Sequence, residues 1–143
     1  MHIQPYLFFN GRAEEALNFY TKAVGAEVTT LMRFKDSPEG SPTDMTPKSW
    51  SDKVMHANVR IGETQVMASD GCSQEPLGFH GFSLSLSAGT IAEVDRCFMA
   101  LADGGKVDMP LSKTFWSPRF GMLTDRFGVA WMIGLFDAKT KAA

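Results

Sequence analysis

The first part of the chain changes from a strand-like to a helix-like pattern of apolar residues. Ile3–Phe9 is apolar enough for a buried strand, and a polar break separates it from a helix that we expect to continue to about Val24. Gly25 is a natural helix C-cap, and Glu27–Phe34 is expected to be a second strand. Apolar residues recur along the helix at the spacing of one buried stripe: Ala13, Ala16, Leu17, Tyr20 and Val24.

A strictly alternating pattern follows a long aperiodic segment. Lys35–Ser51 is rich in proline and serine and is expected to be a long loop, of the kind that serves as a lid, a binding loop or an interface arm. Val54–Ile61 alternates residue by residue, and a turn joins it to a further strand at Thr64–Ser69. Within the alternating strand Met55, Ala57 and Val59 share one face, and His56, Asn58 and Arg60 share the other.

The second half repeats the order of the first. Phe82–Ser87 alternates as a strand, and a helix follows with Ile91, Val94, Phe98 and Leu101 on its expected buried stripe. Three more strands are expected: Lys106–Met109 continuing past Pro110, Arg119–Thr124 and Ala130–Leu135; the residues from Ala138 onward are expected to form a frayed tail.

The two halves align at an offset of about 79 positions, which brings Phe19 to Phe98 and Gly25 to Gly104. This duplication predicts an α+β fold in which two βαβββ modules form one domain over 1–143. The expected modules are about 1–70 and 79–137, joined by a turn-rich linker at 70–78. A binding site is expected on the surface that the modules share.

The parity of the strands predicts where that site lies. Apolar faces such as Phe82, Leu84 and Leu86 should pack on the helices. The opposite faces are polar in the middle of the sheets, at His56/Asn58/Arg60 and at Ser83/Ser85/Ser87. Polar side chains at such positions are explained by a wet cavity around which the sheets curl.

Composition excludes several classes of function. The formal net charge of −2 over 143 residues offers no basic field for nucleic acid, and no apolar run approaches the length of a membrane span. The N-terminal residues lack a signal-peptide pattern, so a cytoplasmic protein is expected. Cys72 and Cys97 lack metal-type spacing and are expected to be separate, reduced thiols.

Three segments resemble a known family: PYLFFNGRAEEALNFYTKAVGAEV, DKVMHANVRIGETQVMASD and FWSPRFGMLTDRFGVAWMI. Together they are similar to the PhnB-like, or demethylubiquinone methyltransferase-like, branch of the vicinal oxygen chelate superfamily. That superfamily includes glyoxalase I, bleomycin-resistance proteins and extradiol dioxygenases. The resemblance implies paired βαβββ modules around a cavity, commonly in a homodimer.

The resemblance also implies where a glyoxalase-type metal would bind, with one His, Glu or Gln on each of four cavity-facing strands. Carried over one by one, those places fall on Gln4 or Pro5, on Met67 or Ser69, on Gly81 or Ser83, and on Met132. This set offers almost no imidazole or carboxylate, so neither a metal nor another cofactor is expected. If a divalent metal does bind, His56 and Gln4 are its expected ligands.

His56 is the candidate catalytic residue, because a cavity-facing imidazole can act as a base or a ligand near neutral pH. The alternative is a structural histidine bonded to a neighbouring strand or a dimer partner. His80 is expected to be structural or exposed. Asn58 and Arg60 share the face of His56 and could hold an anionic or carbonyl-bearing ligand, or Arg60 could pair with an acid such as Glu63. The expected ligand-binding residues are Gln4, Tyr6, Asn58, Arg60, Ser83, Ser85 and Trp116.

Three hypotheses follow from the sequence. The first is a homodimeric protein that binds a small organic molecule. The second is a metal-assisted lyase, isomerase or dioxygenase that acts on an oxygen-rich small molecule through His56, with Gln4 and Arg60. The third is a dimeric structural domain with a vestigial site. A methyltransferase is disfavoured, because the glycine-rich fingerprint after a strand and the room for a doubly wound sheet are both missing.

Overall fold

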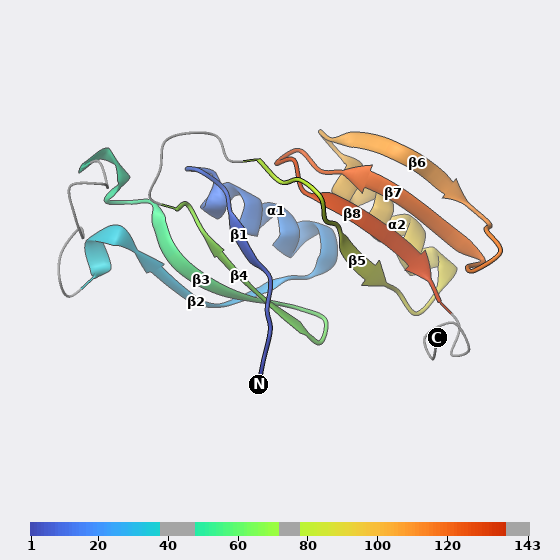
Figure 1. Ribbon diagram of the computed structural model, residues 1–143, viewed down its shortest axis with the longest axis horizontal. Coiled ribbons are helices and arrows are strands. Elements are labelled where there is room, and N and C mark those ends of the chain that lie inside the picture. The colour runs from blue at the N-terminus through green and yellow to red at the C-terminus, as the bar shows by residue number, and fades with distance from the viewer. Residues whose placement is uncertain (38–47, 72–77, 137–143) are drawn as a thin grey trace. The chain divides into compact units, whose positions relative to one another are not determined.

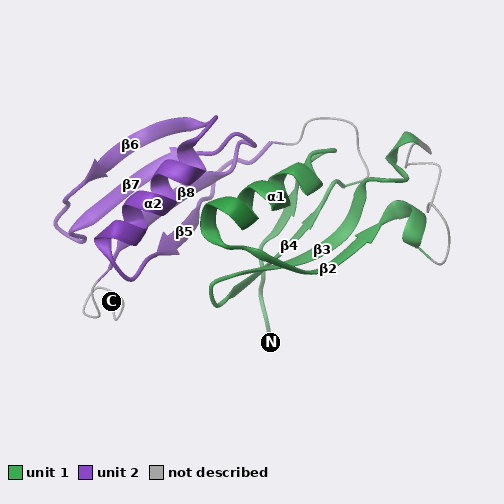
Figure 2. Cartoon of the chain, turned by 180° about the vertical axis from the view of Figure 1, so that it is seen from behind, with its two compact units in different colours: residues 1–77 green, residues 78–143 purple. Residues whose placement is uncertain are grey.

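The computed structural model describes residues 1–37, 48–71 and 78–136. The chain divides into two compact units, residues 1–77 and 78–143 (Figure 2). Each unit is described on its own. The expected linker falls largely outside the described residues, as do Cys72 and the expected C-terminal tail.

The first unit has the order strand, helix and three strands (Figure 1). Its elements are β1 (Tyr6–Phe8), α1 (Ala13–Val24), β2 (Glu27–Arg33), β3 (Val54–Ile61) and β4 (Thr64–Ser69), with short 3₁₀ helices η1 (Phe34–Asp36) and η2 (Lys48–Trp50). The sheet order is β1-β4-β3-β2. β1 runs parallel to β4, whereas β3 is antiparallel to both of its neighbours.

The second unit repeats this topology. Its elements are β5 (Leu84–Ser87), α2 (Ile91–Ala102), β6 (Lys106–Ser112), β7 (Arg119–Thr124) and β8 (Ala130–Leu135). The sheet order is β5-β8-β7-β6, again with the first strand parallel to the last and the remaining pairs antiparallel. The predicted α+β fold with two βαβββ modules is therefore confirmed. The single domain and the shared cavity stay predictions.

In the first unit α1 covers one face of the sheet. The predicted stripe residues Ala13, Ala16, Leu17 and Tyr20 are buried, as are the sheet residues that share their core: Leu7, Ala57, Val59, Val66 and Ala68. The N-terminus of α1 is capped by a residue that is distant in the sequence. The buried carboxylate of Asp70, just after β4, accepts hydrogen bonds from Gly11 N and Ala13 N with Oδ1 and from Val54 N with Oδ2, each at 2.8 Å. One side chain thus ties the helix to two strands.

In the second unit the helix is capped locally. Thr90 Oγ1 accepts a hydrogen bond from Glu93 N at 3.1 Å, so the N-cap residue itself satisfies a free amide. The core includes Val94, Leu101, Leu123 and Ile133. Buried Asp125 holds the β7–β8 turn and accepts a hydrogen bond from Trp131 Nε1 at 2.9 Å.

Two strands are shorter at their start than the pattern predicts. The strand expected at Ile3–Phe9 begins at Tyr6, because Pro5 has no N–H and contributes only its carbonyl, which accepts from Met67 N. The strand that was expected to begin at Phe82 begins at Leu84. Phe82 is exposed and lies against the ring of Phe79 instead of packing on α2.

The remaining differences are at element ends. Ile91, expected on the buried stripe of α2, is exposed because it is the first residue of the helix. Phe34 belongs to η1 rather than β2 and packs on Trp50 of η2, so the expected loop at 35–51 has a short helix at each described end. Residues 38–47 lie outside the described part of the chain.

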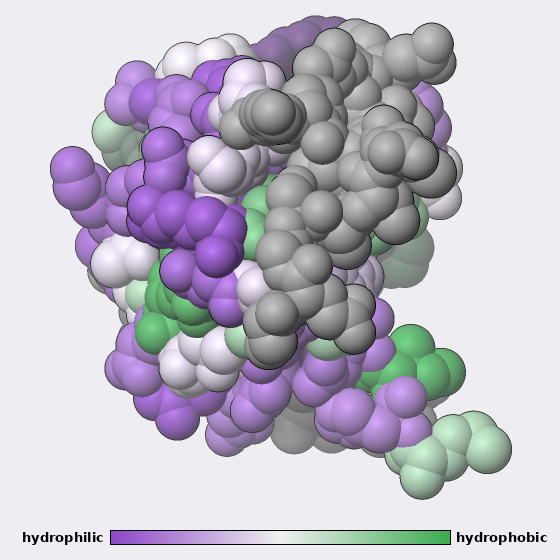
Figure 3. Space-filling view, turned by 90° about the vertical axis from the view of Figure 1, so that its left-hand side faces the viewer, coloured by the Kyte–Doolittle hydropathy of each residue, from purple (hydrophilic) through white to green (hydrophobic). Residues whose placement is uncertain are grey.

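At the end of the first unit where η1 and η2 lie, the surface of the described residues is mostly hydrophilic, with small separate hydrophobic areas (Figure 3). None of the helices in the described ranges is long and apolar enough to cross a membrane.

Candidate functional site

The face of the first sheet opposite α1, here called the open face, carries two rows of side chains. The strand register aligns Phe8 of β1, Ser69 of β4, His56 of β3 and Met32 of β2 in one row. The next row contains Tyr6, Met67, Asn58 and Thr30. The predicted parity of β3 is therefore confirmed, and the open face is where a ligand could meet polar and aromatic groups together.

Tyr6 and His56 are in direct contact across this face. Tyr6 Oη lies 2.8 Å from His56 Nδ1, although β4 separates their strands. On β4, the strand between them, Ser69 is a small residue, which leaves room for the phenol to reach the imidazole. The rings are tilted, with centroids 5.6 Å apart. This contact joins residues fifty positions apart in the sequence.

The phenol of Tyr6 is partly buried by this arrangement. Burial raises the pKa of Tyr6 above its ordinary value of 10.0, and a side-chain hydrogen bond with Ser69 offsets part of that rise. The hydroxyl group is therefore protonated throughout the neutral range and is available as a hydrogen-bond donor.

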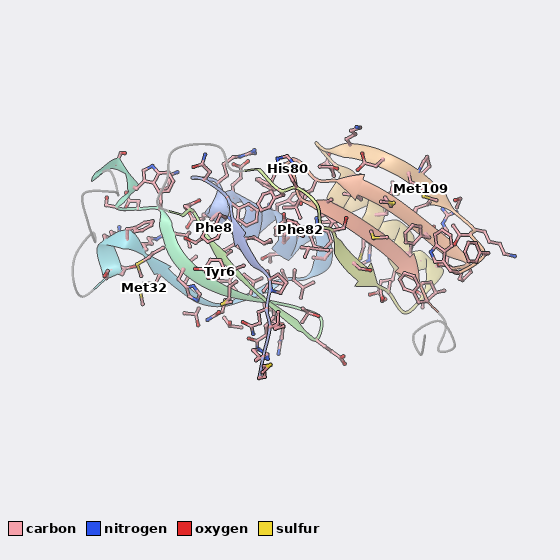
Figure 4. The ribbon with its side chains drawn as sticks, viewed as in Figure 1. Tyr6, Phe8, Met32, His80, Phe82 and Met109 are labelled. Carbon is pink, nitrogen blue, oxygen red and sulfur yellow. The ribbon has the colours of Figure 1, made fainter. Side chains whose placement is uncertain are left out.

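Asn58 completes the polar group. His56 Nε2 lies 3.3 Å from Asn58 Oδ1, so both nitrogens of the imidazole have neighbours. Phe8 stacks on Tyr6 with ring centroids 4.9 Å apart and an interplanar angle of 21°. Figure 4 shows Tyr6 and Phe8 on β1 and Met32 on β2. The site is thus a line of polar groups beside an aromatic surface.

Two of the predicted site residues have other partners. Gln4 Nε2 lies 2.7 Å from His2 Nε2, before the start of β1. Arg60 Nη2 lies 2.5 Å from Glu27 Oε2, the residue opposite it on β2. The sequence suggested Glu63 as an acid for Arg60, whereas the ladder supplies Glu27.

The other predicted ligand-binding residues belong to the second unit. Ser85 lies on β5, and Ser83 precedes that strand. Trp116 is half-buried and packs edge-on against Phe115 and Phe120. Whether these residues act together with Tyr6 and His56 stays a prediction. His80, also in the second unit, is exposed, as expected.

The donors of the site do not fit the divalent metal that the fold family implies. Around His56 they are a phenol, an amide and a hydroxyl. Within the described ranges, no group of three or more His, Cys, Asp or Glu side chains could hold a metal ion. A borderline cation prefers imidazole, thiolate or carboxylate ligands. We therefore assign no step of any reaction to a metal here.

Sequence reasoning missed two contributors to this face, Phe8 and Met32, and considered Ser69 only as a possible metal-site position. Phe8 and Met32 lie in strands that the sequence predicts, and both are exposed on the open face. The alternation within each strand contained the signal for their side. The strand order needed to bring them beside His56 was not visible in the sequence.

Comparison with known proteins identifies the family. The sequence profile of the family described as 3-demethylubiquinone-9 3-methyltransferase matches residues 1–134. Protein YjdN of Escherichia coli is 36% identical over 142 residues, which cover 94% of this chain and 95% of YjdN. The chain belongs to this PhnB-like family.

Solved structures agree with this assignment. The protein PA1353 from Pseudomonas aeruginosa is 44% identical, with a TM-score of 0.82 over 95% of this chain and 98% of its own. The PhnB protein from Bacillus cereus is 30% identical, with a TM-score of 0.79 over 94% of this chain and 99% of its own. At 12% identity, a glyoxalase/bleomycin resistance protein/dioxygenase domain from Frankia shares the fold with a TM-score of 0.67 over 96% of this chain and 98% of its own. The chain therefore has the vicinal oxygen chelate fold.

Proposed function

We propose that this protein binds a small organic molecule on the open face of the first sheet. The observation that carries the proposal is the contact of Tyr6 with His56 and of His56 with Asn58, on a sheet face opposite the covering helix. Polar side chains in the middle of a sheet, on the face that does not pack against the core, are a common feature of ligand sites.

The apolar surroundings support the same proposal. Tyr6, Phe8 and Met32 are each about two-fifths exposed, although aromatic and thioether side chains gain free energy from burial. A ligand placed over them would bury this surface and meet the polar groups at its edge. A vestigial, purely structural face would have no need of the Tyr6–His56–Asn58 contacts.

An enzyme is the second candidate, because the Tyr6–His56 pair could accept or donate a proton. Its metal-assisted form has less support, given the donor set described above. A methyltransferase has less support still, despite the family's description. Enzymes that bind S-adenosylmethionine generally use a doubly wound parallel sheet, whereas among the described residues only one strand pair in each sheet is parallel.

The resemblance also leads us to expect a homodimer in the cytoplasm. Light scattering coupled to size-exclusion chromatography would test the dimer. A monomer at micromolar concentration would contradict it without affecting the proposed ligand site.

The direct test is an NMR titration of the histidine ring signals. The chain has three histidines, of which His2 and His80 are exposed and serve as internal controls. The probes are a panel of small aromatic and aliphatic compounds, both neutral and anionic. We expect at least one compound to shift the His56 signals in a saturable manner and to leave those of His80 in place.

A second arm uses His56→Ala, which removes the hydrogen-bond partner that holds Tyr6 and Asn58 in place and should weaken binding of that compound at least about fivefold. Elemental analysis of both proteins, purified without chelator, separates the enzyme hypothesis from the binding hypothesis. About one metal per chain that is lost in His56→Ala would favour the metal-assisted enzyme.

If no compound in the NMR titration shifted the His56 signals, the proposed site would be wrong.

A further inference from the structure

The charged side chains of the open face neutralise one another. The register places Glu27 and Arg60 opposite each other on β2 and β3, one row beyond Asn58. Their Nη2–Oε2 distance is 2.5 Å. An anionic ligand would meet a guanidinium whose charge the Glu27 carboxylate already offsets.

The remaining polar groups of the face form a neutral chain. Asn58 Oδ1 can only accept a hydrogen bond, so the nearby Nε2 of His56 carries the hydrogen. In the neutral imidazole, Nδ1 then accepts from the hydroxyl of Tyr6, 2.8 Å away. In this arrangement both ring nitrogens of His56 have a hydrogen-bond partner, and none of the three side chains carries a charge. It leaves the amide N–H groups of Asn58 to donate to an oxygen of a ligand.

The apolar part of the face is largely aromatic. Tyr6 and Phe8 stack nearly parallel, and Met32 lies beyond His56 on the far strand (Figure 4). Aromatic faces and the thioether of methionine both contact rings favourably.

We propose that the open face selects a flat, uncharged molecule that has a ring and a hydroxyl or carbonyl oxygen, and that it discriminates against the corresponding anion. This inference rests on the proposed function and names the chemical class of its ligand. The ring lies over Tyr6 and Phe8, and the oxygen accepts a hydrogen bond from Asn58. An anion in the same place loses hydration without gaining a free cation in return.

The test compares three probes that share one ring system: 1-naphthol, naphthalene and 1-naphthoate. Titration at pH 7, followed by calorimetry and by the His56 ring signals, gives their affinities. We expect 1-naphthol to bind about two- to tenfold more tightly than naphthalene, the range of one net hydrogen bond. We expect 1-naphthoate to bind at least about tenfold more weakly than 1-naphthol, because its carboxylate is desolvated without compensation.

A matched pair of variants tests the role of the ion pair between Glu27 and Arg60. Glu27→Gln releases Arg60 and should strengthen 1-naphthoate binding about tenfold while changing 1-naphthol binding less than about twofold. Glu63→Gln is the control, because it removes a carboxylate at the β3–β4 turn that does not pair with Arg60. It should leave all three affinities unchanged.

The outcomes separate this inference from the proposed function. If 1-naphthoate binds as tightly as 1-naphthol and shifts the His56 signals, the neutral-ligand inference is overturned and the site stands. If Glu27→Gln behaves like Glu63→Gln, the account of Arg60 is overturned. If none of the three probes shifts the His56 signals, both the inference and the proposed site lose their support.

Discussion

The two sheets of this protein have the same topology and opposite chemistry on the faces away from their helices. In the first unit one row across the sheet contains Tyr6, Met67, Asn58 and Thr30. In the second unit the corresponding row contains Ser85, Met132, Met122 and Met109. The offset that aligns the halves pairs Tyr6 with Ser85 and Thr30 with Met109.

This difference shows that duplication preserved the fold and not the surface chemistry. Packing against the helix constrains one face of each sheet in the same way, so both covered faces are apolar and buried. The other face is free to change. In the first unit it holds the Tyr6–His56–Asn58 contacts, and in the second it holds three methionines, which suit apolar and adaptable contacts.

The helices differ in a related manner. α1 depends on Asp70, which lies more than fifty residues away in sequence, whereas α2 depends on its own N-cap Thr90. The stability of the first unit should therefore be more sensitive to substitution of Asp70 than the stability of the second unit is to substitution of Thr90. The predictions below test these contrasts, from the largest expected effect to the smallest.

Asp70→Ala should destabilise the first unit by on the order of 3 kcal/mol or more, because three amide N–H groups lose a charged acceptor in a buried place. Thr90→Ala is the counterpart in the second unit and should cost about 1 kcal/mol. Urea unfolding followed by tryptophan fluorescence would measure both. Equal losses would mean that distant and local capping contribute alike.

Gly105→Ala should destabilise the second unit by roughly 1–3 kcal/mol, the usual result of overpacking. A Cβ at this position would lie 2.3 Å from the carbonyl oxygen of Thr124. The equivalent position in the first unit is already alanine, buried Ala26. Ala26→Gly is therefore the matched control, and thermal unfolding should show the smaller change for it.

Exchanging one residue between the two rows tests their chemistry. Asn58→Met should remove the preference for 1-naphthol over naphthalene and change the free energy of unfolding by less than about 1 kcal/mol, since Asn58 is only half-buried. Met122→Asn, the reverse exchange in the second unit, should cost about 1 kcal/mol through lost apolar contact. Retention of the 1-naphthol preference in Asn58→Met would contradict the role given to its amide.

Tyr6→Phe should have the smallest effect on stability beyond the loss of the contact with His56, and the pH-dependent part of that effect should appear only at high pH. Because burial raises the pKa of Tyr6, the folded state holds this proton more tightly than the unfolded state. The stability that depends on the neutral phenol is complete below pH 10.0 and is lost as the pH rises through the raised value. The variant should therefore lose less stability than the wild type between neutral and strongly alkaline pH, as measured by urea midpoints. An identical loss would show that the phenol is not desolvated.

Much of the fold could be predicted from periodicity alone. The strands Val54–Ile61, Thr64–Ser69, Arg119–Thr124 and Ala130–Leu135 have the predicted bounds. Long alternating runs succeed because one buried face fixes the side of every residue. The prediction was wrong where a local feature interrupts a ladder, as at Pro5, or where an apolar residue stands at an element's end, as at Phe82 and Ile91.

The sequence by itself determined the duplicated βαβββ order and the face on which His56, Asn58 and Arg60 lie, because side-chain direction along a strand is a local property. Only the tertiary structure decided which groups meet there: Tyr6 with His56, Arg60 with Glu27 rather than Glu63, and Asp70 with the first turn of α1. These pairings depend on the order β1-β4-β3-β2 and on the register between strands far apart in the chain. Neither the order nor the register is contained in the periodicity of any one segment, since both follow from the packing of the whole unit.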